Sequence, residues 1–304
     1  MPRQAESKRA RILLVGGTGQ VGWELVRTLA PLGALHVRDH SSLDLTDQDA
    51  LRAAVRECAP DVIVNAAAYT SVDKAEAEEA LAQAINGTAP GVLGEEAARC
   101  NAVLVHYSTD YVFDGAATVG YRETDATSPL NAYGRSKLAG ETAILGSGAA
   151  AYVFRVSWIY GQRGRNFLKT IQRLAASGSA LRIVADQRGA PTWSRMVAEA
   201  TGLAVGQTLV ARRTGAELPA TGVYHMTAPD HTTWHEFASS IVQAGAAGTG
   251  TPAPEVLPVS TAEYPTAAAR PLSSVLDSSK LARVFGVELP SWREQLRLCL
   301  ESAA

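Results

Sequence analysis

Short apolar runs of strand length alternate with segments of helical length along the first half of the chain. The runs are RILLV, ALHV, DVIVN, AVLVHYS and YVFRVS, at residues 11–15, 34–37, 61–65, 102–108 and 152–157. Runs this apolar are typical of strands buried on both faces, and the intervening segments are long enough for helical crossovers. Because such crossovers are right-handed, the sequence predicts a doubly wound α/β sheet of parallel strands.

The motif GGTGQVG follows the first run directly and places Gly16, Gly19 and Gly22 at the spacing GxxGxxG, with Gln20 and Val21 between the last two. Glycines at these positions allow a tight turn and a close approach of backbone to a pyrophosphate, which then lies at the positive end of the next helix. Alone, the pattern is also found in ordinary tight loops. Its place between a strand and a helix favours a dinucleotide site in a Rossmann-type domain.

The alternation changes after Gly161. A helix is expected at 166–176, followed by a strand LRIVAD, a loop QRGAPTW and a helix from Ser194, and the run GVYHM is expected to return to the sheet. The segment GAAGTGTPAPEVLP, residues 245–258, is rich in Gly and Pro and predicts a loop. A last helix is expected at 292–301.

These patterns predict an uneven division of the chain. We expect a flexible N-terminal tail over residues 1–10 and an NAD(P)-binding Rossmann domain over 11–160 with a returning segment at about 196–230. A smaller, discontinuous C-terminal substrate-binding domain is expected from residues 161–195 and 231–304.

Composition excludes several classes of protein. A formal net charge of -2 over 304 residues gives no electrostatic reason to expect nucleic acid or an anionic membrane as a partner. The chain has no apolar run of membrane-spanning or signal-peptide length. Its three cysteines, Cys58, Cys100 and Cys299, are far apart and have neither disulfide nor metal-site spacing. We therefore expect a soluble protein of the reducing cytoplasm, without a metal site.

The end of the second predicted strand, HVRDHSS, bears on the choice of cofactor. A residue about 20 positions beyond the glycines contacts the adenosine ribose, where an acidic side chain suits NADH and an arginine suits the 2'-phosphate of NADPH. Arg38 favours NADPH, whereas Asp39 beside it leaves NADH open, and both charges are also consistent with solvated loop residues. Further on, Asp44 is expected to accept from the adenine amino group and Leu45 to pack on the ring.

The segment NAYGRSKLAGE places Tyr133 and Lys137 four residues apart in a predicted helix, hence on one face. An unperturbed phenol titrates near pH 10, and a nearby ammonium lowers that pKa because it favours phenolate. A phenol tuned in this way can protonate a developing alkoxide as a hydride reaches a carbonyl carbon. Lys137 is also expected to bond the nicotinamide ribose.

The fourth run ends in HYSTDYVFDG, so Thr109 and Asp110 lie at the carboxyl end of a parallel strand, where open α/β sheets bind ligands. The Thr109 hydroxyl is expected to bond the substrate oxygen together with Tyr133. Asp110 is expected to bind a sugar hydroxyl or to relay the proton. A polar strand-to-loop turn without chemistry is the alternative. Together the motifs indicate a reductase site.

Several motifs taken together resemble the extended short-chain dehydrogenase/reductase superfamily and, more narrowly, the dTDP-4-dehydrorhamnose reductases. They are GGTGQVG, NAAAYTSVDKAE, YSTDYVFDG, SPLNAYGRSKLAGE, FRVSWIYG, DQRGAPTW and AEYPTAAARP, and the match runs from about Arg11 to the C-terminus. The resemblance implies reduction of the 4-keto group of dTDP-4-dehydro-β-L-rhamnose to dTDP-β-L-rhamnose, a precursor of cell-wall and other polysaccharides. A reduced nicotinamide would be the cofactor and a dTDP-sugar the substrate.

The resemblance also assigns roles by matching motif. It makes Tyr133 the proton donor, Lys137 its electrostatic partner and Thr109 the hydroxyl of the triad, with Thr109 and Asp110 contacting the sugar. Residues that follow the third strand, Ala68, Tyr69 and Thr70, would line the cofactor. Three others would lie near the sugar or the nucleotide diphosphate: Trp158, Asn166 and Arg270. Trp158 is equally consistent with a core aromatic, and Arg270 with a solvated loop charge.

The sequence departs from the family at one point. Some members form dimers linked by Mg²⁺ through glutamates, one of which follows the GAPT stretch. Here Trp193, Ser194 and Arg195 occupy that place, and a cation replaces a hard oxygen ligand. We therefore expect no Mg²⁺-linked dimer, and either a monomer or another homodimer.

Two other functions remain open. Sugar-nucleotide epimerases and dehydratases of the superfamily share the tyrosine and lysine, but dehydratases commonly follow the threonine with an Asp-Glu pair, where this chain has Asp110 and Tyr111. That difference argues against dehydration more than against epimerisation. A related fold serves as the regulatory subunit of methionine adenosyltransferase, a binding module. The complete set of Thr109, Tyr133 and Lys137 favours catalysis.

Overall fold

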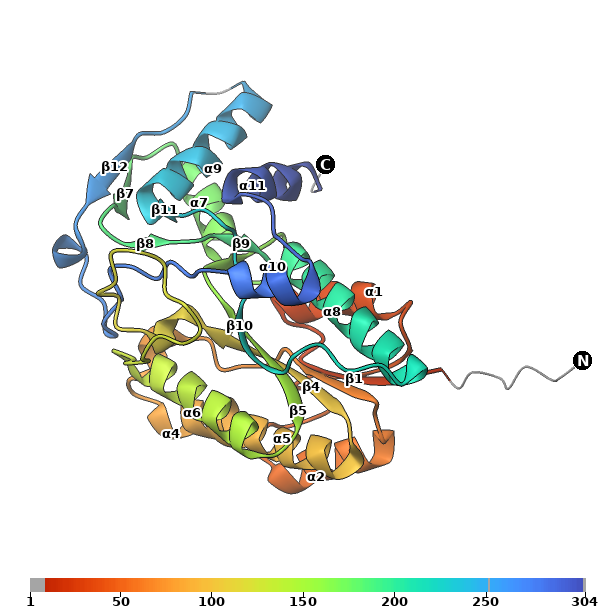
Figure 1. Ribbon diagram of the computed structural model, residues 1–304. Helices are drawn as coiled ribbons and strands as arrows, with labels where there is room; N and C mark the ends of the chain where they lie inside the picture. The colour runs from red at the N-terminus through yellow and green to blue at the C-terminus, as the bar shows by residue number, and fades with distance from the viewer. Residues whose placement is uncertain (1–8, 251, 303–304) are drawn as a thin grey trace, which may run out of the picture.

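Six parallel strands form the central sheet in the computed structural model, which describes residues 9–250 and 252–302 (Figure 1). Across the sheet they run β10 (Gly222–His225), β5 (Ala150–Val156), β4 (Val103–Thr109), β3 (Val62–Asn65), β1 (Arg11–Val15) and β2 (Ala34–Arg38). The chain builds from β1 outward to β2 and then crosses to β3 on the other side. In such sheets the ligand site lies at this reversal, outside the carboxyl ends of β1 and β3.

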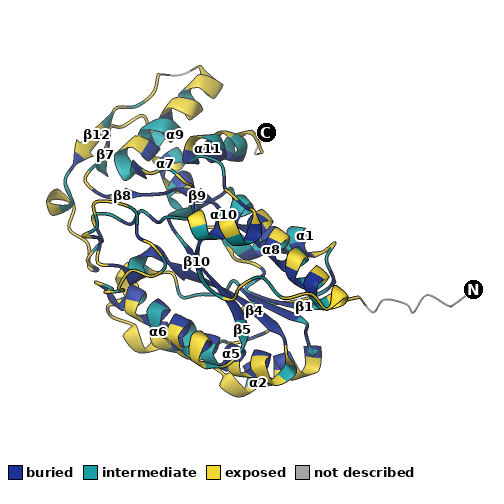
Figure 2. Cartoon of the chain, viewed as in Figure 1, coloured by how far each residue is buried: buried dark blue, intermediate teal, exposed yellow. Residues whose placement is uncertain are grey.

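The burial of each strand explains its sequence. Every residue of β3 and β4 is buried, as are all but the first of β1, so these strands lie between two helical layers and are apolar throughout (Figure 2). The edge strand β2 is only half-buried and accordingly carries His36 and Arg38. The five predicted strands and the predicted return of GVYHM are confirmed.

Helices cover both faces of the sheet. One face packs against α1 (Gln20–Leu29), α8 (Ser194–Thr214) and α10 (Ser279–Phe285). The other packs against α2 (Gln48–Cys58), α5 (Ala89–Cys100) and α6 (Ala132–Gly146). Shorter turns precede or follow these helices: α3 (Val72–Ala75), α4 (Glu79–Gln83), the π-helix η1 (Ala84–Thr88) and the 3₁₀ turns η2 (Asp110–Val112) and η3 (Thr261–Glu263). The doubly wound fold is confirmed.

A separate apolar cluster lies beyond the carboxyl edge of the sheet. It is formed by three helices, α7 (Phe167–Ala175), α9 (Trp234–Thr249) and α11 (Trp292–Glu301), with side chains such as Phe237 and Trp292 at its centre. Short strands complete it: β6 (Ile159–Tyr160) with β9 (Thr192–Trp193), β7 (Leu181–Val184) with β12 (Val256–Val259), and β8 (Arg188–Gly189) with β11 (Thr232–Thr233). The expected domain boundaries themselves stay a prediction.

Three local expectations are corrected. The predicted loop at 245–258 is wrong at both ends, because α9 continues through GAAGT until Gly250 caps it at φ 68° and because β12 begins at Val256. The predicted loop QRGAPTW contains the short strands β8 and β9. Residues 1–8 of the expected tail lie outside the described residues, but Ala10 is paired, since its carbonyl accepts from Ala34 N at 2.7 Å.

No helix in the described part of the chain has the length and apolar character needed to cross a membrane.

Candidate active site

The glycine turn joins β1 to α1 beside the start of the loop that follows β3. Gly16 has φ 87°, and a Cβ there would lie 2.6 Å from the backbone nitrogen of Ala67. A Cβ on Gly22 would collide with the carbonyl oxygen of Gly16. Both positions therefore require glycine. Gly19 is the N-cap of α1, and no side chain caps the first turn of the helix, which begins with Gln20 and Val21. The start of a helix without such a cap is suited to an anion.

Arg38 closes β2 next to this turn, and its carbonyl oxygen accepts from the nitrogens of Gly16 and Gly17 at 2.8 and 3.3 Å. Its guanidinium is 30% exposed and lies 3.5 Å from the exposed carboxylate of Glu57, a contact loose enough to give way to a phosphate. Asp39 accepts from Ser41, and these hydrogen bonds lower its pKa. Asp39 thus belongs to the turn, whereas Arg38 is held only loosely.

Asp44 and Leu45 follow the same turn. Asp44 is exposed and accepts from both the nitrogen and the hydroxyl of Thr46 at 2.8 Å, which lowers its pKa. Leu45 is partly buried against the core below. Contact of either residue with an adenine stays a prediction.

The loop after β3 is held in place by Asn86 of η1, which is fully buried. Its Oδ1 accepts from Tyr69 N at 2.8 Å, and its Nδ2 donates to the Tyr69 carbonyl at 2.9 Å and to Ser136 Oγ at 3.0 Å. Ala68 and Tyr69 are half-buried and Thr70 is exposed. One side chain thus positions the loop expected to line the cofactor against the helix that carries Tyr133.

Tyr133 lies in the first turn of α6, whose start is fixed by Asn131. The Asn131 Oδ1 accepts from Gly134 N at 2.8 Å as the N-cap. Gly134 must lack a Cβ, because one would collide with the carbonyl of Tyr111. The rings of Tyr111 and Tyr133 therefore meet edge to face, with centroids 5.9 Å apart.

The expected depression of the Tyr133 pKa is not found. Burial raises the pKa of Tyr133 to about 12, a hydrogen bond with Thr109 lowers it in part, and the charge of Asp110 raises it further. Burial is thus the largest cause at Tyr133, and Lys137 instead donates from Nζ to the carbonyl oxygen of Tyr107 at 2.5 Å and lies 3.2 Å from Nε2 of His106. The phenol is therefore protonated at neutral pH.

Lys137 is itself unusual. It is 1% exposed, and burial lowers its pKa to about 8, while the carboxylate of Glu141 acts in the opposite direction. Glu141 is paired through two hydrogen bonds, at 2.9 and 2.6 Å, with the buried guanidinium of Arg155. Because Glu141 is paired with Arg155, Lys137 forms no ion pair with it.

Thr109 ends β4 directly before Asp110. The Thr109 hydroxyl donates to Asp110 Oδ1 at 2.9 Å, and Ser157 Oγ donates to Oδ2 at 2.8 Å. Burial raises the pKa of Asp110, and these hydrogen bonds lower it in part. The structure thus gathers Thr109, Asp110 and Tyr133 at the carboxyl end of β4.

Trp158 follows β5 in the left-handed region, at φ 46°, which is rare for a bulky residue and marks backbone strain. Its ring stacks on Trp234, with centroids 3.5 Å apart and planes 5° from parallel, and covers Gly189, where a Cβ would collide with it. The half-buried Trp158 therefore joins the sheet to the small apolar cluster.

Arg270 is not the solvated loop charge that the sequence left open. It is 16% exposed and pairs with Asp73 at 2.8 Å, while the neighbouring carbonyl of Ala269 accepts from Asn131 Nδ2 at 2.8 Å. Its loop thus packs against the start of α6.

Asn166 caps α7, accepting from Lys169 N at 3.1 Å. Its Nδ2 donates to Gln20 Oε1 at 2.9 Å and to Gly161 O at 2.8 Å. Asn166 thereby ties the segment after β6 to the glycine turn, and its contact with a nucleotide stays a prediction.

Arg195, which follows the GAPT stretch, lies 3.2 Å from Glu24 of α1. Among residues 9–250 and 252–302 no cluster of three His, Cys, Asp or Glu side chains suited to a metal ion occurs.

Several buried polar residues of the site were not anticipated, among them Asn65, Asn86 and His106. His106 lies within an otherwise apolar strand and Asn65 ends another, and a buried polar residue in such a run indicates a hydrogen-bond partner in the core. Asn86 gave only the weak signal of an Asn-Gly pair in a helical pattern.

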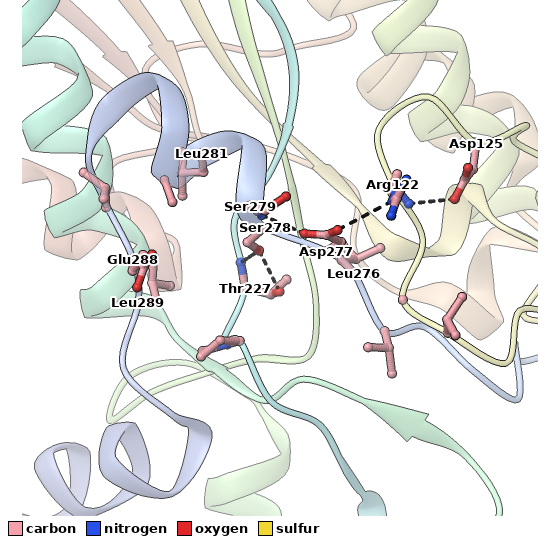
Figure 3. Close-up of a pocket in the computed structure, with 16 residues that line it drawn as sticks. Arg122, Asp125, Thr227, Leu276, Asp277, Ser278, Ser279, Leu281, Glu288 and Leu289 are labelled. Carbon is pink, nitrogen blue, oxygen red and sulfur yellow. Dashed lines mark hydrogen bonds and ion pairs between the residues drawn. The ribbon is translucent and has the colours of Figure 1, made fainter.

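A cavity of about 760 Å³ lies elsewhere, between the segment 119–125, the end of β10 and α10 (Figure 3). None of the site residues predicted from the sequence lines it. Its charged lining includes Arg122 and Asp277, whose side chains lie 3.8 Å apart. It is thus separate from the predicted site.

Comparisons with known proteins agree with the geometry. The family model described as the RmlD substrate binding domain matches residues 10–304. The dTDP-4-dehydrorhamnose reductase of Burkholderia thailandensis is 46% identical over 294 residues, 95% of this chain and 98% of that protein. A probable dTDP-4,6-dihydroxy-2-methyloxan-3-one 4-ketoreductase of Streptomyces antibioticus is 39% identical over 94% of this chain and 93% of that one. The crystal structure of dTDP-4-dehydrorhamnose reductase from Bacillus anthracis in complex with NADP has TM-score 0.86 and 33% identity, with 97% and 99% of the two chains covered.

Proposed function

The chain belongs to the RmlD substrate binding domain family, and from this membership we propose that it reduces the 4-keto group of dTDP-4-dehydro-β-L-rhamnose. The product is dTDP-β-L-rhamnose and the reductant is NADPH. The observation that carries the proposal is the gathering of Thr109, Asp110 and Tyr133 at the carboxyl end of β4, in the same sheet edge as the glycine turn. The relatives named as dTDP-4-dehydrorhamnose reductases support the choice of substrate.

The glycine turn fits a dinucleotide. The space that a Cβ would fill at Gly16 and Gly22 is taken by backbone, and the first turn of α1 would bind the pyrophosphate of a dinucleotide through its N–H groups. Arg38 would bind the 2'-phosphate, and Tyr69 would line the groove. NADPH held there supplies the hydride for the carbonyl carbon. The structure of the Bacillus anthracis relative, which contains NADP, supports this cofactor.

Tyr133 supplies the proton. Burial holds its pKa at about 12, so the phenol is fully protonated at neutral pH. An alkoxide forming at C4 is a far stronger base than this phenolate, so the proton moves downhill from Oη to the substrate oxygen. Thr109 hydrogen-bonds Tyr133 and orients its hydroxyl. Lys137, on the same face of α6, would bond the nicotinamide ribose.

The sugar and nucleotide bind between the sheet edge and the small cluster. Asp110 is fixed by Ser157 and Thr109 and is proposed to accept from a sugar hydroxyl. Trp158 and Arg270 are proposed to flank the dTDP group, because each is held rigidly by a partner from a distant segment. Residues 161–195 and 231–304 are proposed as the substrate-binding domain, a role supported by their own apolar core.

A second candidate substrate comes from the Streptomyces antibioticus relative, whose name gives a different keto sugar of dTDP. Both candidates need the same proton donor at C4 and differ in the hydroxyls presented to Asp110. A site built to bond a hydroxyl rejects an analogue that lacks it by several orders of magnitude. The substrate test below therefore separates them.

We also infer that the enzyme works in the cytoplasm, as a monomer or homodimer. The cysteines Cys58, Cys100 and Cys299 are all free thiols, which suits a reducing compartment.

The test follows NADPH oxidation with dTDP-4-dehydro-rhamnose, made in place from dTDP-glucose by the dehydratase and epimerase, and with the second keto sugar in parallel. We expect one NADPH consumed per rhamnose formed. Isomerisation of a dTDP-sugar without net NADPH oxidation would instead identify an epimerase. Tight binding of NADPH without turnover of any keto sugar would identify a binding module, and either result would reject the proposal.

A further inference from the structure

The loop that joins β6 to α7, residues 161–166, lies against the first turn of α1. The Nδ2 of Asn166 is 2.9 Å from Gln20 Oε1 and 3.0 Å from the carbonyl oxygen of Arg163, so one amide closes the loop and ties it to the helix. On the other side, Gln162 Nε2 donates to a carbonyl oxygen of α11 at 2.8 Å. Contacts with two different helices therefore set the position of the loop beside the glycine turn.

The tip of this loop reads Arg163-Gly164-Arg165. Gly164 has φ 73°, and a Cβ there would lie only 3.2 Å from Gln20 Cγ, so glycine suits both the turn and the close approach. Consecutive Cα atoms are about 3.8 Å apart, so both arginines begin next to Gln20, the first residue of α1. Both are exposed, and neither forms an ion pair with a carboxylate in the part of the chain that the structure describes.

Trp23 holds one of the two guanidinium groups. The central carbon of the Arg163 guanidinium lies 3.3 Å from the centroid of the Trp23 ring, a cation–π contact. Trp23 follows Gln20 by three residues, so the two side chains share one face of α1, and side chains of a helix lean toward its N-terminus. Stacking therefore keeps the Arg163 guanidinium beside the first turn of the helix.

Positive charge at this place is unfavourable unless an anion joins it. The N-terminal end of a helix carries partial positive charge and favours acidic side chains, yet the first turn of α1 has none. Glu24, further along the helix, is already paired with Arg195 at 3.2 Å. A separate observation is the glycine turn itself, where Gly19 is exposed and backbone takes the space of a Cβ at Gly16. Two arginines above such a turn indicate an anion with more than one charge.

We propose that Arg163 and Arg165 form a cationic clasp for a diphosphate at the start of α1, with Trp23 as the residue that positions Arg163. The inference rests on the proposed function, which brings two diphosphates to the protein, one in NADPH and one in the dTDP-sugar. A guanidinium can bind two phosphate oxygens side by side, so two arginines match the oxygens of one diphosphate. Arg163 exchanges its contact with the Trp23 ring for charge-assisted hydrogen bonds, which are stronger.

The test measures binding by the full chain and does not depend on turnover. Calorimetric titration gives the Kd of NADPH and the Kd of dTDP for the native protein and for the double variant Arg163→Gln with Arg165→Gln. We expect at least one of the two Kd values to rise by about 10–100-fold, and the ligand affected identifies the source of the diphosphate. Unchanged Kd values for both ligands would overturn the inference.

Adenosine 2'-phosphate separates the clasp from Arg38, because it carries the phosphate proposed for Arg38 and no diphosphate. The double variant should bind it within about twofold of the native protein, whereas Arg38→Ala should weaken it. Equal losses of NADPH and adenosine 2'-phosphate in the double variant would show a general effect of charge and overturn the inference. Arg213→Gln, at an exposed position in the last turn of α8, is the control for lost charge and should leave every Kd within about twofold.

Trp23→Leu tests the positioning role, because it removes the stacking surface and keeps both arginines. We expect the Kd of the affected ligand to rise in this variant, and the same substitution to add little in the double variant, which has no guanidinium for Trp23 to hold. Fully additive losses would show that Trp23 does not act through Arg163. Thermal unfolding of each variant identifies any loss of fold.

The outcomes also separate the clasp from the proposed reaction. Binding that depends on Arg163 and Arg165 in a protein that reduces no keto sugar would uphold the clasp and reject only the proposed function. Normal turnover by the double variant, with unchanged Kd values, would reject only the clasp.

Discussion

Tyr133 and Lys137 share one face of α6, but the Lys137 amino group donates to the carbonyl of Tyr107 while burial raises the pKa of Tyr133 to about 12. The proposed proton donor is therefore protonated at neutral pH, and Lys137 is hydrogen-bonded to β4. This arrangement leads to the first of four predictions.

Tyr133→Phe removes the proposed proton donor and keeps the ring that meets Tyr111. We expect kcat to fall by about 10²–10⁴-fold, the usual contribution of a positioned acid, with little change in the Kd for NADPH. Steady-state kinetics and fluorescence titration measure both quantities. Tyr264→Phe, at a position 56% exposed, is the matched control and should retain full activity. Comparable kcat for the two variants would remove Tyr133 from the mechanism.

Arg38→Ala tests the choice of cofactor. The contact of Arg38 with Glu57 is loose, so the folded state should lose little stability. If Arg38 pairs with the 2'-phosphate, the Kd for NADPH should rise by about 10–100-fold and that for NADH by no more than about twofold. Glu57→Gln frees Arg38 and should leave NADPH binding equal or tighter. Equal losses for both nucleotides would show that Arg38 does not recognise the phosphate.

The pair Glu141–Arg155 is 2% and 4% exposed, so Glu141→Gln leaves a buried guanidinium without its counter-charge. We expect the free energy of unfolding to fall by about 3–5 kcal/mol in denaturant titrations. Replacing both residues together, as Glu141→Leu with Arg155→Met, should restore most of that loss. The matched control is Glu301→Gln at the exposed pair with Arg297, expected to cost about 0–1 kcal/mol. Similar costs at the two sites would contradict the argument from burial.

Stability should also depend on pH through Glu96, which is 2% exposed and bonded to Arg56 and Arg99. The pKa of Glu96 is lowered from 4.5 to about 2, and its hydrogen bonding with Arg56 is the largest cause. Because the folded-state pKa is depressed, this stabilisation is present above about pH 4.5 and lost as pH falls toward 2. We expect Glu96 to contribute on the order of 2 kcal/mol to the free energy of unfolding, a figure already reduced because its arginine partners are half-exposed. Glu96→Gln should be less stable at pH 7, and its difference from the native protein should vanish near pH 2.

Much of the sheet was predictable because apolar runs and helical spacing are local properties. The five runs became β1 to β5, and α11 spans the predicted residues 292–301. The prediction of a loop was wrong at residues 245–249, because the Gly-rich sequence GAAGT continues α9. Helix and loop compete closely in such a sequence, and packing of α9 against α7 decides between them.

The site was predictable in its residue types and only partly in its contacts. The spacing of Tyr133 and Lys137 placed them on one helix face, which α6 confirms. It did not reveal that His106 and the Tyr107 carbonyl engage Lys137, because these groups come from β4 and meet α6 only after folding. Arg270 likewise finds Asp73, 197 residues away, through a loop whose path no local pattern specifies.

The sequence by itself determined the order of strands and helices, the glycine turn and the residues with chemistry at the strand ends, since each follows from short-range periodicity and backbone sterics. The tertiary structure alone decided which charges are buried and what they touch. Burial at Tyr133 and Lys137 moves their pKa values in directions that isolated side chains would not predict, because desolvation depends on everything packed around a group. The protonation state of the site is therefore a property of the whole fold.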